Sequence, residues 1–441
     1  MITLIAQGLA FDEYPAFALY RNKPNPLSGI KRGVMSDYLW AEAQFLLLVY
    51  LRRLDNDHSA RFRTPSKTAP YRIRYKTASS SHEQETSQVA DMLCKPSICT
   101  VSLGRCSAGH SLQHKLDVAK KYGFQAIELF FEDLTDLTKP MPGGDQPSNQ
   151  LAAAAAIRKL CDDRELSILC LQPFMHYEGL IDRELHQKKI KDAKFWVHLA
   201  HILGTDMILL PSSFLSPSEL STDRDMMIRD MVEIADVGLE ATPIIRFAYE
   251  ALCWGTRVDT WEASWDVVQR VSRSNFGICL DTFNIAGRIY ADPAIPSGRT
   301  ENCNEAIEAS LREMIASVDP QKLFLVQVAD AEKLAQALDN NHPFYSQEQP
   351  PRMSWSRNAR LFYGENDRGG YLPIKRILDV IIHDIGYQGW LSFEVFHRIL
   401  LENRRRIPET MARRAERSWR RMERDLALGR PTADYKTQAL L

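Results

Sequence analysis

The sequence predicts an α/β protein, built as a single (β/α)8 TIM barrel that follows an irregular N-terminal extension. From residue 94 on, eight short apolar runs alternate strictly with eight longer amphipathic stretches. The runs are almost continuously apolar, which is typical of parallel strands that helices cover on both faces. A closed barrel is favoured over an open doubly wound sheet because no glycine-rich phosphate-binding motif follows the first run, where Ser102-Leu103-Gly104-Arg105-Cys106 stands instead.

Each predicted strand is a run of β-branched or apolar residues between polar or turn-forming ones. We expect strands at 97–103, 126–131, 166–172, 207–211, 245–251, 276–281, 323–328 and 390–395. We expect helices, with apolar residues three and four apart, at 112–122, 150–163, 183–203, 225–239, 261–271, 305–318, 373–385 and 409–426. These units place the catalytic domain at residues 94–428 and leave 429–441 as a C-terminal tail.

The N-terminal extension, residues 1–93, has no sustained period of two or 3.6 residues. Polar and proline-containing pieces dominate it, and residues 51–82 hold eight basic residues against two acidic ones. Such a composition offers too little apolar surface to offset the entropy lost on ordering, so we expect a poorly ordered extension. A targeting or partner-binding arm is the alternative interpretation.

The composition excludes several classes of partner. The 55 Lys and Arg against 56 Asp and Glu give a net charge of -1, which creates no overall attraction to nucleic acid or anionic lipid. The eight cysteines form no C-x-x-C pair. We interpret them as buried free thiols of a protein in a reducing compartment. The apolar stretch at 39–51 is shorter than the roughly 20 residues of a membrane span. We predict a cytoplasmic protein with neither nucleic acid nor membrane as partner, and the oligomeric state stays open.

Each of the last four predicted strands ends at or near a residue whose side-chain oxygen could bind a metal ion. These residues are Glu250, Asp281, Gln327 and Glu394. Because the carboxyl ends of barrel strands meet at one mouth, we expect these side chains to lie together. Clustered carboxylates repel one another unless a cation neutralises them. The donor set favours Mg²⁺ or Mn²⁺ over Zn²⁺, with Co²⁺ as a third candidate. A helix cap or salt bridge is the alternative for any single member.

Two histidines and two arginines are candidates for catalysis or substrate binding. His176 follows the third strand and His110 precedes the first helix, and either could be a general acid or base because imidazole titrates near neutrality. Either could equally be a capping or surface residue. Arg257 and Arg288 follow the fifth and sixth strands, where they could bind a substrate carboxylate or form an outward salt bridge.

Three further polar residues are expected at the same mouth, as substrate-binding residues. Glu128 lies in the second strand, Gln172 ends the third, and Asn284 follows the sixth. The stretch at 331–371 is too long for a plain connector, and long loops at a barrel mouth commonly act as lids.

Several motifs spread over residues 95–428 carry a family resemblance. They are Ser102-Leu103-Gly104-Arg105, Gly109-His110-Ser111-Leu112, Gln125-Ala126-Ile127-Glu128-Leu129-Phe130, Leu171-Gln172-Pro173-Phe174, Asp281-Thr282-Phe283-Asn284-Ile285-Ala286-Gly287-Arg288 and Phe393-Glu394-Val395-Phe396. Together they resemble the fungal 3-dehydroshikimate dehydratases of quinate catabolism, within the sugar-phosphate isomerase/epimerase or xylose-isomerase-like barrel superfamily.

The resemblance implies a metal-dependent carbon–oxygen lyase that converts 3-dehydroshikimate to protocatechuate (3,4-dihydroxybenzoate) and water. It implies a metal-stabilised enolate followed by β-elimination, and it places the family's metal ligands on the same four strand-end residues. Bacterial relatives have a histidine where this chain has Asn284, so the base stays open between His176, His110 and a metal-bound hydroxide. A metal-dependent ketose isomerase or epimerase is the alternative hypothesis for the activity, and a non-catalytic barrel is the third hypothesis.

Overall fold

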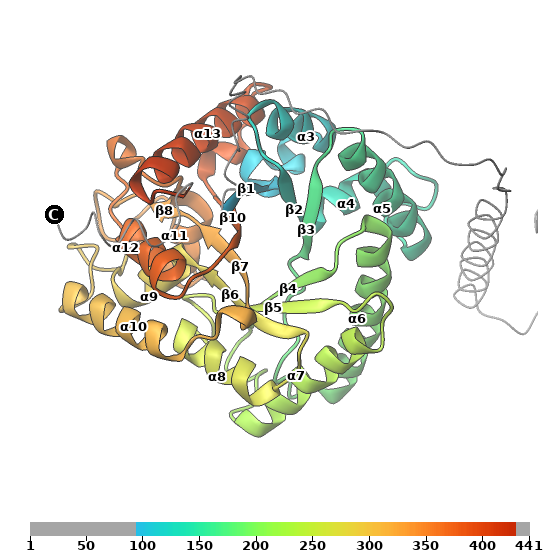
Figure 1. Ribbon diagram of the computed structural model, residues 1–441, viewed down its shortest axis with the longest axis horizontal. Helices are drawn as coiled ribbons and strands as arrows, with labels where there is room; N and C mark the ends of the chain where they lie inside the picture. The colour runs from blue at the N-terminus through green and yellow to red at the C-terminus, as the bar shows by residue number, and fades with distance from the viewer. Residues whose placement is uncertain (1–93, 429–441) are drawn as a thin grey trace, which may run out of the picture. The chain divides into compact units, whose positions relative to one another are not determined.

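The computed structural model describes residues 94–428, and it confirms the predicted closed barrel of eight parallel strands surrounded by helices (Figure 1). Around the barrel the strands follow the order β1-β10-β7-β6-β5-β4-β3-β2. They are β1 (Cys94–Cys99), β2 (Ala126–Phe130), β3 (Ser167–Gln172), β4 (Met207–Pro211), β5 (Arg246–Glu250), β6 (Phe276–Asp281), β7 (Leu323–Val328) and β10 (Gly389–Phe393). The extension and the tail predicted at 1–93 and 429–441 lie outside the described residues.

The first strand begins and ends earlier than the sequence predicts. It begins at Cys94, and Thr100–Leu103, which were expected to continue it, form a 3-10 helix. The apolar run continues across this change of backbone, so the composition of the run did not mark the end of the strand.

Eight helices correspond to the predicted ones within a few residues. They are α3 (Leu112–Lys121), α5 (Pro147–Asp162), α6 (Arg183–Leu203), α7 (Arg224–Leu239), α8 (Trp261–Val271), α10 (Cys303–Ser317), α12 (Ile374–Asp379), which continues into a π-helical turn, and α13 (Ile407–Asp425). Three helices were not predicted: α4 (Phe131–Thr138), α9 (Thr282–Ile289) and α11 (Pro351–Ala359). Both α4 and α9 begin at the residue after a strand, so strand and helix share one apolar run in the sequence.

The barrel interior changes from apolar to polar along the strands. Ala248, Cys279 and Leu325 belong to a small buried cluster inside the barrel. Residues two apart on a strand face the same side, so the residues that follow these at the carboxyl ends, Glu250 and Asp281 among them, also face the interior. The larger apolar core packs between the strands and the surrounding helices.

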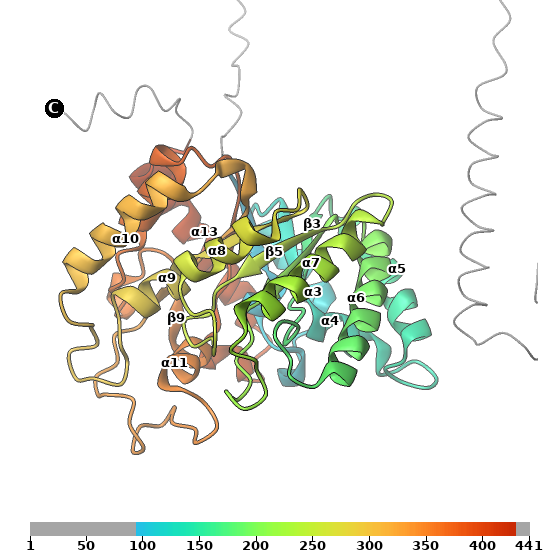
Figure 2. The same ribbon diagram turned by 90° about the horizontal axis from the view of Figure 1, so that it is seen from below.

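The segment between β7 and β10 forms a separate structure at the carboxyl ends of the strands. It contains α11 and a two-stranded antiparallel sheet of β8 (Asp330–Ala331) and β9 (Arg360–Leu361). Figure 2 shows α11 and β9 together at one end of the barrel. Asp330 fixes the base of this segment, because its carboxylate accepts backbone N–H bonds from Ala331, Tyr371 and Leu372.

Among the helices in residues 94–428, none combines the length and the apolar character needed to cross a membrane.

Candidate active site

Three of the four predicted metal ligands converge at the carboxyl ends of the strands. Glu250, Asp281 and Glu394 are 2%, 2% and 4% exposed, and one oxygen from each lies within 4.8 Å of the others. Glu250 ends β5, Asp281 ends β6 and Glu394 follows β10. Asp281 also caps α9 by accepting a hydrogen bond from the Phe283 amide at 2.7 Å. The fold thus collects three carboxylates where almost no water reaches them.

The fourth predicted ligand, Gln327, lies beside this group. It is fully buried and pairs with Asp281 in the register of the neighbouring strands. Its side-chain nitrogen donates to Glu128 Oε2 at 2.8 Å, and its oxygen accepts from the Cys279 thiol at 3.6 Å. The amide therefore bonds a further buried carboxylate, that of Glu128 on β2.

Gln172 and Asn284, both predicted as substrate-binding residues, donate hydrogen bonds to these carboxylates. Gln172 Nε2 donates to Glu128 at 2.9 Å and to Glu394 at 3.0 Å. Asn284 Nδ2 donates to Glu250 at 2.7 Å and to Asp281 at 3.0 Å, while its oxygen accepts from a backbone amide. Glu128, the third residue of that prediction, accepts from both Gln172 and Gln327 and is completely buried. In this structure all three belong to the network that orients the acids.

The clustering of carboxylates penalises their charged forms. Burial, followed by the charges of Glu394 and Asp281, raises the pKa of Glu250 well above its ordinary value. Burial raises the pKa of Glu394 to about 8, and it also raises the pKa of Glu128. The second oxygen of Glu128 is buried without a hydrogen-bond partner. A hard divalent cation would offset this repulsion through the oxygen donors present, so the donor set fits such an ion.

Arg360 is the functional residue that sequence reasoning missed. It is 1% exposed, and its Nη1 donates to Asp281 at 2.7 Å and to Glu394 at 3.1 Å. Its guanidinium also lies 4.3 Å from the ring centre of Phe283 and 5.3 Å from that of Phe396. Arg360 comes from β9, in a stretch without a strand or helix pattern long enough to place it. The only signal in the sequence was indirect, because a buried cluster of acids requires positive charge nearby.

The two candidate histidines lie in different surroundings. His176 has a left-handed backbone with φ of 59°, its Nδ1 lies 3.2 Å from Ser213 Oγ, and its ring meets Phe214 edge-on at 4.4 Å. Burial, followed by the charge of Lys189, lowers its pKa to about 4. His110 is buried, and its Nε2 lies 2.9 Å from the carbonyl oxygen of Glu402.

Neither predicted substrate arginine contacts the acids. Arg257 is exposed and donates to the carbonyl oxygens of Pro217 and Leu220. Arg288 pairs with Asp259 at 2.6 Å. Arg288 thus forms a salt bridge, which is the alternative interpretation of the sequence, while Arg257 bonds carbonyl oxygens of a neighbouring loop.

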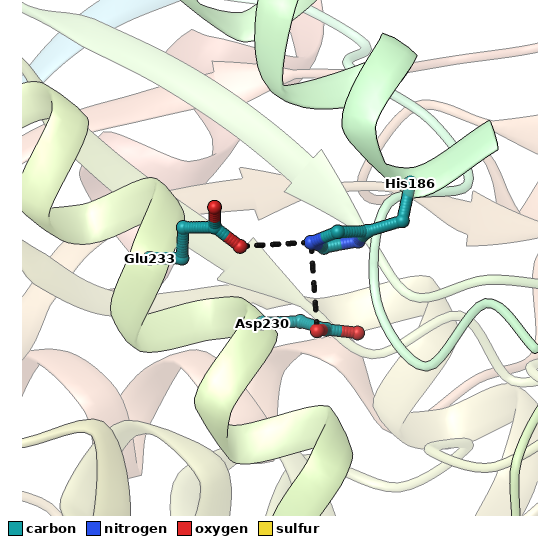
Figure 3. Close-up of side chains that lie close together, drawn as sticks. All are labelled: His186, Asp230 and Glu233. Atoms are coloured by element: carbon teal, nitrogen blue, oxygen red, sulfur yellow. Dashed lines mark hydrogen bonds and ion pairs between the residues drawn. The ribbon is translucent and has the colours of Figure 1, made fainter. Parts of the chain in front are cut away.

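A second cluster of metal-ligand types lies between α6 and α7. His186 Nε2 is 2.8 Å from Glu233 and 3.5 Å from Asp230 (Figure 3). Asp230 also accepts two bonds from Arg183 and one from the Gly179 amide. Here the two carboxylates already have a guanidinium, a histidine ring and a backbone amide as hydrogen-bond partners. We interpret this cluster as a link between the two helices.

Comparisons with known proteins agree with this architecture. Residues 116–421 match the family described as xylose isomerase-like TIM barrel. The chain is 50% identical over 343 residues to a 3-dehydroshikimate dehydratase of Neurospora crassa, across 76% of this chain and 96% of that protein. It is 31% identical over 306 residues to a 3-dehydroshikimate dehydratase of Pseudomonas aeruginosa, across 68% of this chain and 38% of that longer protein.

Solved structures with the same fold include a xylose isomerase-like TIM barrel/4-hydroxyphenylpyruvate dioxygenase fusion protein. It is 26% identical with a TM-score of 0.54, and the match covers 75% of this chain and 44% of that one. An IOLI protein with a binding zinc atom gives a TM-score of 0.54 at 15% identity, across 76% of this chain and 98% of that one. At this identity the second likeness shows the fold alone.

Proposed function

We propose that this chain, which belongs to the xylose isomerase-like TIM barrel family and within it to the 3-dehydroshikimate dehydratases, converts 3-dehydroshikimate to protocatechuate and water. The observation that carries this function is the 50% identity to the Neurospora crassa dehydratase over 96% of that protein. The buried group of Glu250, Asp281 and Glu394 supplies a site where such chemistry can occur.

A divalent metal ion is the cofactor that the donor set supports. We propose Glu250, Asp281 and Glu394 as its ligands, with the side-chain oxygen of Gln327 as the fourth. Oxygen donors favour Mg²⁺ or Mn²⁺, and Co²⁺ is a third candidate. When bound, the ion supplies Lewis acidity to the ketone oxygen of the substrate.

The remaining polar residues hold the carboxylates in place before substrate arrives. Asn284 bridges Glu250 and Asp281, and Arg360 bridges Asp281 and Glu394. Because these donors are themselves buried, the acids keep their positions without reorganisation during the reaction. We assign Asn284, Gln172 and Glu128 to this positioning role.

The reaction requires a group that removes a proton from the hydroxylated carbon beside the ketone. The hydroxyl group one carbon further on then leaves and takes a proton to become water. Loss of a second proton from a ring carbon, with a proton taken up by the former ketone oxygen, completes the aromatic ring. We propose His176 as the base, because it follows β3 at the carboxyl ends of the strands and an imidazole can accept a proton there. His110 is the weaker candidate, because one ring nitrogen is held by the Glu402 carbonyl.

We propose that the partner of this site is a small molecule that carries a ring and a carboxylate, 3-dehydroshikimate. The cysteines support the predicted cytoplasmic location: all eight are free and buried.

The test is turnover by folded protein loaded with Mn²⁺ or Mg²⁺. We expect the ultraviolet absorption of protocatechuate to appear when 3-dehydroshikimate is added, and no epimerisation of neutral ketoses under the same conditions. Epimerisation of a ketose without conversion of 3-dehydroshikimate would favour the isomerase or epimerase alternative. Inactivity toward both would favour a non-catalytic barrel.

A further inference from the structure

His176 stands in a loop whose backbone is held in an unfavourable conformation. Its φ of 59° lies in the left-handed region, which residues other than glycine seldom adopt. Such a conformation persists only where the surrounding structure holds it. On one side of His176, Lys189 on α6 donates to the Met175 carbonyl oxygen at 2.9 Å. On the other side, the Tyr177 hydroxyl donates to the Asp230 carbonyl oxygen on α7 at 2.8 Å. The loop is therefore fixed to two helices.

A buried carboxylate joins the same loop to the ends of β4 and β5. Glu178 is 4% exposed, and its Oε1 accepts from the Ser213 amide at 2.6 Å and from the Tyr249 hydroxyl at 3.2 Å. Ser213 follows β4, and Tyr249 lies in β5. The backbone amide of Ser212 donates to the Glu250 carbonyl oxygen at 2.8 Å. The loop with the candidate base thus packs against the strand end that supplies a proposed metal ligand.

The imidazole of His176 has one nitrogen with a protein partner and one without. Its Nδ1 lies 3.2 Å from Ser213 Oγ, on a serine that is 1% exposed. The same oxygen also accepts a bond from the Leu215 amide at 3.4 Å. The other ring nitrogen, Nε2, bonds to no group within residues 94–428, and it does not belong to the buried side-chain atoms that lack a partner. Nε2 is therefore the accessible nitrogen of the ring.

We propose that Ser213 is the positioning residue for the base, because its Oγ accepts a hydrogen bond from Nδ1–H of His176. In a neutral imidazole one nitrogen carries the proton and the other accepts, so this bond leaves the lone pair on Nε2. Nε2 then takes the proton from the substrate carbon, and the electron pair of that C–H bond stays on the substrate as the enolate. The ring becomes an imidazolium whose Nδ1–H bond to Ser213 is charge-assisted. The inference rests on the proposed function for the reaction, and it adds the tautomer of the base and the residue that sets it.

The first test observes the tautomer and does not depend on turnover. Protein labelled with nitrogen-15 at histidine, with diamagnetic Mg²⁺ at pH 7, gives long-range NMR correlations that distinguish a protonated ring nitrogen from an unprotonated one. The spectrum of His176→Asn identifies the His176 signals among the 11 histidines, and asparagine tolerates a left-handed backbone. We expect the proton on Nδ1 in the wild type and a mixture of both tautomers in Ser213→Ala. A proton on Nε2 in the wild type, or the same tautomer in both proteins, would overturn the proposal.

The second test asks whether Ser213 acts through His176. We expect Ser213→Ala to lower kcat for 3-dehydroshikimate about 3- to 10-fold with KM unchanged, because the base loses one hydrogen bond and the substrate loses none. In a His176→Asn background the same substitution should cost nothing further. Ser221→Ala is the matched control. Ser221 Oγ also accepts the amide two residues further on, at 3.0 Å, but within residues 94–428 it bonds to no histidine.

The kinetic outcomes separate positioning from a structural role. The control variant should keep the wild-type kcat. An equal loss of kcat in Ser221→Ala, a rise in KM that accounts for the loss in Ser213→Ala, or full additivity of the Ser213 and His176 substitutions would contradict the positioning role. If the wild-type protein fails to convert 3-dehydroshikimate, the proposed function fails, and the tautomer seen by NMR still decides whether Ser213 orients His176.

Discussion

Arg360 donates a hydrogen bond of 2.7 Å to Asp281, and the two side chains are 1% and 0% exposed. The same guanidinium nitrogen reaches Glu394 at 3.1 Å. Residues 79 and 34 positions apart in the chain are thereby tied together inside the mouth of the barrel. The stability of the fold and the arrangement of the proposed metal ligands therefore depend on one positive charge.

Removing that charge should destabilise the protein. We expect Arg360→Met to lower the free energy of unfolding by about 3 to 5 kcal/mol, because it leaves two buried carboxylates without their cation. Urea unfolding of the metal-free protein measures the change. Arg398→Met is the control, since Arg398 and its partner Glu332 are 43% and 27% exposed. That variant should lose less than about 1 kcal/mol. Equal losses in both variants would contradict the account.

Asn284 should matter for rate more than for stability. We expect Asn284→Ala to lower kcat/KM about 10- to 100-fold, because Glu250 and Asp281 lose the donor that fixes their orientation. Steady-state kinetics at saturating Mn²⁺ measure the effect. Asn149→Ala is the control, because its amide contacts only loop carbonyls. An Asn284 variant as active as the control would show that the orientation of these acids does not limit the reaction.

The pH dependence of stability should contain a contribution from Asp330. Burial raises the pKa of this carboxyl to about 6, so the folded state favours its protonated form. Its contribution is fully present below the pKa of the unfolded chain, near 4, and is lost as pH rises through about 6. The loss is on the order of 3 kcal/mol. Asp330→Asn should remove this slope between about pH 4 and pH 6, as unfolding measured across that range would show. Parallel curves for the two proteins would refute the assignment.

Metal removal should affect both activity and stability. Dialysis against a chelator should abolish turnover, and Mg²⁺ or Mn²⁺ should restore it. Ion at 100 times its Kd should also stabilise the fold by about 2.7 kcal/mol, since the ligands converge only in the folded chain. Thermal unfolding with and without Mn²⁺ checks this. Full activity in chelated protein that is free of metal by elemental analysis would exclude the proposed cofactor.

The barrel and the positions of its acids could be predicted from the sequence, because both follow from the local pattern of apolar and polar residues. Most strands are nearly continuous apolar runs, and Glu250, Asp281 and Glu394 stand at or just beyond the end of such a run. Alternation of side chains then decides which residues face the interior. This reasoning needs no knowledge of contacts between distant segments.

The residues that sequence missed depend on such contacts. Arg360 lies in a segment whose course is set by packing, as when the buried Trp355 donates to the Glu332 carbonyl. Asn284 was placed at the mouth but assigned to substrate, because its two bonds to acids require the helix α9, which the sequence did not reveal. Partners of this kind are determined by tertiary structure and carry no local signature.

The measurement that tests the central claim most directly compares the turnover of 3-dehydroshikimate by wild-type protein, Glu394→Gln and Glu233→Gln, all with Mn²⁺. Glu233 is a fair control because it is 43% exposed and bonds to His186, in a group of side chains separate from the converging acids. The account predicts protocatechuate from the wild type and the control, and at least a roughly 1000-fold loss in Glu394→Gln with circular dichroism unchanged. A folded Glu394→Gln protein that works at the wild-type rate would contradict it.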